Sequence, residues 1–403
     1  MIEINLINFI ILFFSSASSA GLNFFSQVLY SKVLDLKVLG IYISAVAIFN
    51  ILSPVVMLGL PSFWIRLFGE GDDKYQDSVK KGFKIISISL SLTMMLILIL
   101  AYCTQNEIFI LMLLCFGYLA STVLTEVLIS LDQVVKKYKN VAFLQILPHL
   151  VRVIVILIIY MYIDSFSYFS LAVINTIPFL ILYITAILYY KKYSGKEAKY
   201  SHTIKRSLPY ALGPLLYIIY YQSDIIMIGS FLGQESVPYY SFPVAIVAFA
   251  YMVPSIVYQK LFLSDIHRLY KENKKKAREV YYRGAVFMFI ISIFITIMFY
   301  YIAPVFLDFF FPQYYNNSIK YLKFIVFSIP LMFLIHAFGS VLNVRDYVST
   351  KNVIMCIAAL SNVIANIILI PKFGVYGAIF ATYLSYSYLI LSYFYISKNK
   401  VFA

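Results

Sequence analysis

The stretch SNVIANIILIPKFGVYGAIFATYLS, residues 361–385, is apolar enough to enter a membrane, yet it carries two amides in its first turns. Asn362 and Asn366 are four residues apart, so both side chains lie on one face of a helix. Amides in a span either hydrogen-bond a neighbouring helix or line a polar cavity, and the spacing alone leaves both interpretations open.

The same stretch predicts a turn between two spans. Pro371 cannot donate a backbone N–H, so we expect the first helix to end there. Gly374 and Gly377 then allow a tight reversal of the chain and a close approach of the next helix. A helical hairpin of this kind is typical of a polytopic membrane protein.

The composition of the whole chain agrees with this class. Of 403 residues, 62% are hydrophobic and only 12% are charged, whereas a soluble domain is roughly a quarter charged. A bilayer core needs about 20 apolar residues per helix. We therefore predict an all-α integral membrane protein with twelve transmembrane helices, at residues 5–30, 39–65, 84–103, 107–131, 140–162, 166–190, 208–232, 236–262, 284–305, 318–342, 347–370 and 374–397.

The basic residues predict how these spans are oriented. Of the 32 Lys and Arg residues, 26 fall in loops that follow even-numbered spans and in the C-terminal tail, five fall in the opposite loops, and Arg152 falls inside a span. Basic loops stay on the cytoplasmic side, so both termini are expected to be cytoplasmic. Because the positive charge follows topology in this way, we expect no nucleic-acid partner; the cytoplasmic lysines suit anionic membrane lipids.

Cysteine substitutions at the loops test this orientation. Cysteines placed at Lys274 and Lys199 should react only with a reagent on the cytoplasmic side, whereas cysteines at Gln105, Ser236 and Lys372 should react from the opposite side of the membrane. The measurement is labelling with a membrane-impermeant maleimide in intact and in opened cells. Labelling of position 274 from the outer side would overturn the assignment.

The chain divides evenly around one cytoplasmic loop. We expect an N-terminal six-helix bundle at 1–190, a linker at 191–206 and a C-terminal six-helix bundle at 207–403. A shift of 198 residues aligns 34–49 with 232–247 and pairs Tyr42 with Tyr240. Such parallel repeats in transporters are related by an axis along the membrane normal, so the two bundles are expected to enclose a central cavity.

Polar residues inside the spans are the candidates for function. Gln145, His149 and Arg152 recur at i, i+4 and i+7, which places them on one face. A guanidinium near mid-bilayer costs about 2.5–3.5 kcal/mol even on the mildest insertion scale. Arg152 therefore needs either an anionic ligand or a structural partner, and Glu126 and Asp224 are the carboxylates available.

Asp224 has two interpretations of its own. It is either the counter-ion of Arg152 or the site of a coupling cation, for which H⁺ or Na⁺ is the candidate. Glu126 lies nearer the cytoplasmic end of its span, where we expect it to be solvated. No zinc-protease, nucleophile-elbow, P-loop or D-x-D motif is present in the sequence. We therefore predict a transporter with no catalytic residue, no metal site and no cofactor.

Four blocks resemble one transporter family. The pattern N-x-x-x-N-x-x-L-I-P-x-x-G-x-x-G-A-x-x-A-T at 362–382 looks like the last two spans of the polysaccharide flippases known as Wzx. Residues 220–241 resemble the seventh and eighth spans of that family, although Pro238 replaces its usual Gly. Residues 38–45 and 59–66 are similar to its second span. The family belongs to the multidrug/oligosaccharidyl-lipid/polysaccharide exporter superfamily.

The resemblance implies a flippase of the bacterial inner membrane. It would move an undecaprenyl-diphosphate-linked oligosaccharide repeat unit to the periplasmic leaflet by alternating access, for O-antigen and lipopolysaccharide or another surface polysaccharide. A polysaccharide polymerase and a chain-length regulator are the implied partners. A diphosphate needs a cation, so the expected substrate-binding residues are Arg152, His149, Gln145, Asn362 and Asn366, with Asp224 and Glu126 as coupling or counter-ion residues.

Two alternatives are weighed against this interpretation. A drug or metabolite exporter of the same superfamily is the nearer one, although the polysaccharide-type motif and the few acidic span residues disfavour it. An integral membrane polysaccharide polymerase is the other. It should carry a large periplasmic loop, whereas no outer loop here exceeds about a dozen residues by the span assignment.

Overall fold

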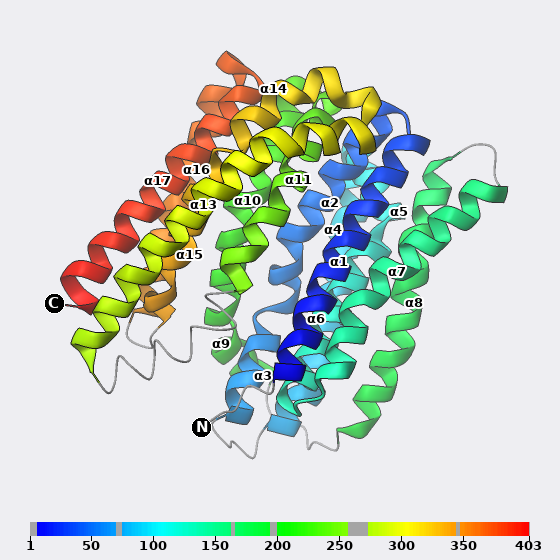
Figure 1. Cartoon of the computed structure of the whole chain (residues 1–403). Coiled ribbons are helices and arrows are strands. Elements are labelled where there is room, and N and C mark those ends of the chain that lie inside the picture. The colour runs from blue at the N-terminus through cyan, green and yellow to red at the C-terminus, as the bar shows by residue number, and fades with distance from the viewer. Residues whose placement is uncertain are drawn as a thin grey trace. The chain divides into compact units, whose positions relative to one another are not determined.

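The computed structural model describes residues 6–69, 75–162, 166–193, 200–256, 273–343 and 347–402, and every element in these residues is helical (Figure 1). The predicted all-α membrane fold is thereby confirmed. The chain divides into two compact units, Met1–Leu215 and Leu216–Ala403. The boundary between these two units falls inside a helix, α10.

The first unit contains nine helices in its described residues and the start of a tenth. They are α1 (Leu6–Val33), α2 (Leu36–Met57), α3 (Leu60–Gly69), α4 (Tyr75–Thr104), α5 (Glu107–Leu114), α6 (Phe116–Val134), α7 (Tyr138–Tyr162), α8 (Tyr168–Lys192), α9 (Tyr200–Ser207) and α10 (Pro209–Leu232).

The described residues of the second unit continue α10 and add α-helices with short 3₁₀ or π turns between them. The elements are η1 (Gln234–Ser236), α11 (Val237–Ile256), α13 (Lys274–Phe310), η3 (Pro312–Tyr314), α14 (Tyr315–Ile325), α15 (Ser328–Ser340), η4 (Val341–Asn343), α16 (Val348–Phe373), α17 (Val375–Ile396) and η5 (Ser397–Val401).

Within the described residues, ten segments are long and apolar enough to cross a membrane, and the count is eleven if the bent pair α5 and α6 forms one span. The predicted first span corresponds to α1, which is 28 residues long. Because the counts above do not reach twelve, the number of twelve spans stays a prediction. Part of the predicted linker is helical, because α8 includes Lys191 and Lys192 and α9 begins at Tyr200; residues 194–199 lie outside the described part.

Two predicted spans are broken, which the hydropathy pattern did not indicate. The span at 39–65 breaks after Met57, where Leu58 and Gly59 adopt left-handed φ values of 51° and 71°. The span at 107–131 bends by 53° at Cys115. The span at 318–342 is not broken in this way, because Asn316–Ser340 forms one segment of 25 residues. Apolar composition favours burial in lipid but does not distinguish a straight helix from a broken one.

The hairpin of α16 and α17 confirms the predicted role of its glycines. Gly374 has φ 61° and its N–H donates to the carbonyl of Ile370, so it ends α16. A Cβ on Gly377 would lie 2.3 Å from the carbonyl oxygen of Leu369. The prediction that the helix ends at Pro371 was wrong by two residues, because α16 continues to Phe373 and Pro371 lies inside its last turn. Tight packing of the hairpin outweighs the hydrogen bond that proline cannot make.

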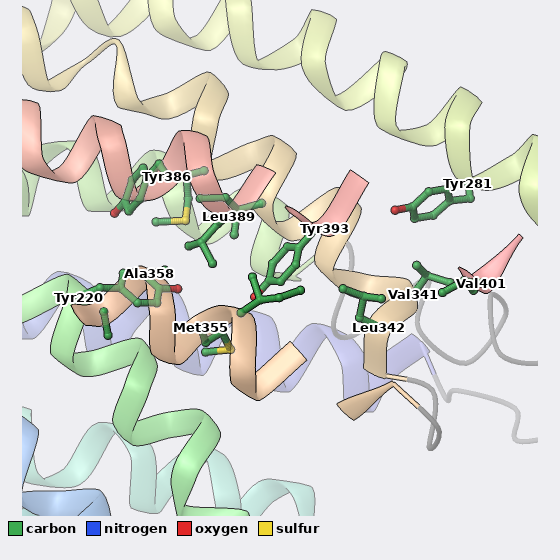
Figure 2. Packing of buried hydrophobic residues seen from close by; sticks show 14 of the residues in the cluster. Tyr220, Tyr281, Val341, Leu342, Met355, Ala358, Tyr386, Leu389, Tyr393 and Val401 are labelled. Atoms are coloured by element: carbon green, nitrogen blue, oxygen red, sulfur yellow. The ribbon is translucent and has the colours of Figure 1, made fainter. Parts of the chain in front are cut away.

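Each unit has its own packing centre. In the first, α6 is buried along most of its length and contacts α2, α3, α7 and α8, while α1 packs along α7. In the second, α16 and α17 pack along each other and α15 contacts α13 and α17 (Figure 1). A hydrophobic cluster fills one end of this second unit, and Figure 2 shows Leu389 and Tyr393 of α17 close to Met355 of α16.

Candidate functional site

The second unit places a carboxylate in its interior. Asp224 on α10 is 2% exposed and accepts three hydrogen bonds. Tyr240 on α11 donates to Oδ2 at 2.8 Å, Thr382 on α17 donates to the same oxygen at 2.5 Å, and Asn366 on α16 donates to Oδ1 at 2.6 Å. Four helices thus meet at one carboxylate, and all three donors are neutral groups.

The two amides of the hairpin complete this cluster. Asn362 and Asn366 are both 0% exposed. Asn366 Nδ2 also donates to Asn362 Oδ1 at 3.1 Å, and Ser223 donates to the same oxygen at 2.7 Å. Asn366 Oδ1 and Asn362 Nδ2 are buried without a hydrogen-bond partner. The two amides therefore join neighbouring helices and also line a polar site.

The donor set at Asp224 fits a hard monovalent cation. Carboxylate, amide carbonyl and hydroxyl oxygens are the ligands that such cations prefer. A buried carboxylate without a positive partner is costly, and its partners here are Tyr240, Thr382 and Asn366. The unpartnered Oδ1 of Asn366 supplies a further oxygen beside the carboxylate. One cation or one proton would neutralise the site.

The first unit buries a charge of opposite sign. Arg152 on α7 is 3% exposed, donates from Nη2 to Ser121 Oγ on α6 at 2.8 Å, and places its guanidinium carbon 4.3 Å from the ring centre of Tyr118. A buried cation–π contact of this kind contributes about 2 kcal/mol. Arg152 Nε has no hydrogen-bond partner. The structure shows no ion pair between Arg152 and Glu126, both of which it describes.

The polar stripe on α7 is divided between two neighbouring helices. Gln145 Oε1 accepts from Ser15 at 3.0 Å, and the backbone carbonyl of Gln145 accepts from Ser19 at 3.0 Å, so this residue binds α1. His149 has a buried Nδ1 without a partner. Gln145 therefore points to α1 while Arg152 contacts α6, and the three predicted residues do not share one set of contacts.

Glu126 is exposed at the middle of α6. Most other positions along this helix are buried, and Gln133, two turns further on, is also exposed. A carboxylate at this depth does not face hydrocarbon without a large cost. We therefore expect the exposed face of α6 at Glu126 to contact water, as the prediction that Glu126 is solvated requires.

Comparison with protein families identifies the family of the protein that contains these two sites. The profile of a family described as polysaccharide biosynthesis protein matches residues 6–264. The chain belongs to this polysaccharide biosynthesis family. A second profile, MatE, matches residues 209–368. None of the curated proteins matches the chain.

Solved structures show that this polysaccharide biosynthesis protein has a transporter fold. The lipid II flippase MurJ in an inward closed conformation is 18% identical, with a TM-score of 0.74 over 98% of this chain and 89% of that one. An inward-facing multidrug resistance MATE transporter of the MOP superfamily is 13% identical, with a TM-score of 0.73 over 97% and 99%. The Vibrio cholerae MATE transporter VcmN follows at 12% and 0.67, over 98% and 97%.

Three residues of the Asp224 site were not among the predicted site residues. Tyr240 was visible in the repeat alignment, and Thr382 ends the quoted hairpin pattern, so signals for both existed. The buried hydroxyl of Tyr42, its repeat partner, also bonds polar groups of its own unit, Tyr30 at 3.2 Å and Asn175 at 3.3 Å. Ser223 precedes Asp224 and carried no separate signal.

Proposed function

We propose that this protein is a flippase that moves undecaprenyl-diphosphate-linked oligosaccharide repeat units from the cytoplasmic to the periplasmic leaflet of the bacterial inner membrane. One observation carries the proposal: a member of a polysaccharide biosynthesis family has the fold of a transporter. Within such a biosynthesis, the step that needs a transporter is the passage of a lipid-linked sugar across the membrane. The likeness to a lipid II flippase supports the same substrate class.

The proposal assigns separate tasks to the two buried charges. Asp224, with Asn362, Asn366 and Thr382, takes the coupling cation, so the two amides serve this cation and not the sugar. Arg152 remains the residue proposed for the diphosphate, with His149 and Gln145 on the same helix. In the described conformation Arg152 is 3% exposed, so contact with a diphosphate requires Tyr118 to move away. Both residues belong to the first unit, so this movement is a rearrangement of α6 and α7 within that unit.

A deletion strain tests the function directly. Loss of a flippase should leave the completed lipid-linked repeat unit on the cytoplasmic leaflet, with surface polysaccharide absent. The measurement is mass spectrometry of the lipid-linked intermediate, combined with its accessibility to a periplasmic enzyme. Which polymer is affected (O-antigen, capsule or exopolysaccharide) follows from the same strain, as does dependence on a polymerase and a chain-length regulator. An intermediate that still reaches the periplasmic leaflet would contradict the proposal.

The match of the MatE profile to residues 209–368 favours a second candidate, export of drugs or metabolites. This function predicts that the deletion strain becomes sensitive to cationic drugs while its surface polysaccharide stays normal. The flippase proposal predicts the reverse. Drug-susceptibility assays on the same strain therefore separate the two candidates.

Substitution of Arg152 tests its proposed role at the diphosphate. Arg152→Lys should keep part of the transport activity because it retains the charge, whereas Arg152→Ala should retain almost none, with both proteins present in the membrane. A guanidinium makes two parallel hydrogen bonds to a phosphate and an ammonium does not. Complementation of surface polysaccharide, with immunoblots for protein level, is the measurement.

Ser121→Ala is the matched control, since it removes the hydrogen bond to Arg152 and leaves the charge in place. If Arg152 only joins α6 to α7, Ser121→Ala should share its defect and both variants should lower the protein level. Normal polysaccharide from well-expressed Arg152→Ala would remove this residue from the mechanism.

A further inference from the structure

One face of α6 is polar and exposed although the rest of this helix is buried. Glu126 and Gln133 are exposed, Tyr118 and Thr122 are half-exposed, and of the remaining positions in α6 only Phe116 is not buried. At about 100° per residue, Thr122, Glu126 and Gln133 fall within about 40° of one another around the helix axis. The exposed face of α6, defined by these three residues and Tyr118, therefore presents a hydroxyl, a carboxylate and an amide in one line.

The carboxylate of Glu126 has no structural task in its unit. Among the residues that the structure describes, it makes neither a hydrogen bond nor an ion pair. The other faces of α6 already pack against α2, α3, α7 and α8. A carboxylate in the middle of a span is too costly to leave against hydrocarbon. Glu126 therefore faces water, and its two oxygens are available to a ligand that arrives from the water.

The exposed face of α6 begins beside the residue proposed for the diphosphate. The guanidinium carbon of Arg152 lies 4.3 Å from the ring centre of Tyr118, which is the first residue of this face. Eight residues of helix, about 12 Å, separate Tyr118 from Glu126. Thr122 lies between them. A substrate whose diphosphate is held at Arg152 can therefore lay its first sugars along Thr122 and Glu126.

The polar groups on this face suit the hydroxyls of a sugar. A carboxylate has two oxygens and accepts from two neighbouring hydroxyls at once, and the amide of Gln133 both donates and accepts. Thr122 donates its own proton to the carbonyl of Tyr118 at 2.9 Å, so its oxygen accepts from a ligand. A sugar that carries a carboxylate would instead be repelled by Glu126. One acidic residue thus both binds sugars and sorts them by charge.

We propose that the exposed face of α6 is a sugar subsite, where Glu126 favours repeat units whose first sugars are neutral or basic over those whose first sugars are acidic. The inference rests on the proposed flippase function and adds a specificity to it. Arg152 binds the diphosphate that all such substrates share, whereas Glu126 distinguishes their sugars. In this assignment Glu126 is neither a coupling residue nor the counter-ion of Arg152, the two roles expected from the sequence.

Equilibrium binding to the purified full-length protein in lipid nanodiscs tests this selection with two probes. Farnesyl diphosphate glucose and farnesyl diphosphate glucuronic acid share their lipid and diphosphate, and they differ only at the sixth carbon of the sugar, where the second carries a carboxylate. We expect the wild-type protein to bind the glucose probe about tenfold more tightly, the effect of two like charges a few ångströms apart at a wet surface. At about 1 M salt this preference should largely disappear, because the repulsion is screened.

Two substitutions at Glu126 should change this preference by different amounts. Glu126→Gln keeps the size and loses the charge, so it should bind the two probes within about threefold of each other. Glu126→Lys should prefer the glucuronic acid probe, because attraction replaces repulsion. Asp35→Asn is the matched control, since Asp35 is exposed in the same unit, precedes α2 and makes no side-chain cap hydrogen bond; it should keep the wild-type preference. Melting temperature is recorded for every variant.

The outcomes separate the sugar subsite from the proposed function. Equal binding of the two probes by the wild-type protein, or an unchanged preference in Glu126→Gln and Glu126→Lys, would overturn the selection by Glu126 and leave the flippase proposal standing. Loss of both probes in Glu126→Gln at an unchanged melting temperature would also overturn it, because the carboxylate would then be needed for binding as such. A folded wild-type protein that binds neither probe would refute the flippase proposal, and the subsite with it.

Discussion

Asp224→Asn is expected to reach the membrane at the wild-type level and to support almost no transport. Its carboxylate accepts from Tyr240, Thr382 and Asn366 and is the charged member of the site. An asparagine keeps the size and loses the charge that attracts a cation. Insertion should not suffer, since an ionised aspartate at the centre of a span costs about 2.5–3.5 kcal/mol.

Complementation of surface polysaccharide, repeated over a range of pH and sodium concentration, is the measurement for this variant. Asp308→Asn is the matched control, because Asp308 is exposed near the end of α13; it should transport normally. Normal transport by Asp224→Asn under all of these conditions would show that no ion is coupled at this site. A drop in protein level without a transport defect per molecule would indicate a structural role.

Gly377→Ala is expected to remove most of the protein from the membrane. The added Cβ would lie 2.3 Å from the carbonyl oxygen of Leu369 and 2.6 Å from the backbone nitrogen of Ile370. Overpacking typically costs about 1–3 kcal/mol. We expect a cost at the upper end of this range or above it, because the obstructing atoms belong to the backbone of α16. A shift of this backbone would also displace Asn366 and Asn362. The measurement is protein level and melting temperature in detergent.

Gly21→Ala is the matched control for this substitution. Gly21 lies in α1, and a Cβ there would meet no atom within 4 Å. Alanine favours a helix over glycine by about 1 kcal/mol, so this variant should be as stable as the wild type or slightly more so. A wild-type melting temperature for Gly377→Ala would show that the two helices of the hairpin separate easily.

The sequence was sufficient for the features that depend on local composition. Long apolar runs predicted helices because a chain in lipid must pair its own backbone groups, and the described residues are helical throughout their elements. The glycines at Gly374 and Gly377 predicted the hairpin, since a left-handed φ and a close approach leave few alternatives. The break after Met57 and the bend at Cys115 were missed, because both segments are as apolar as an unbroken span.

The candidate site was predicted only as separate residues. Asp224, Asn362 and Asn366 were chosen because polar groups are costly in a span, and this reasoning treats each helix alone. It left open whether Asp224 pairs with Arg152, and it grouped Asn366 with the sugar ligands. The structure instead surrounds Asp224 with Tyr240, Thr382 and Asn366.

What the sequence by itself determined is therefore the class of the protein, its helices, its hairpin and the polar residues that demand an explanation. What the tertiary structure alone decided is which of those residues meet. Asp224 and Asn366 are 142 residues apart in the chain and 2.6 Å apart in the fold. Helical periodicity states which side of its own helix a residue occupies, whereas the partner across the interface depends on how α10, α11, α16 and α17 pack.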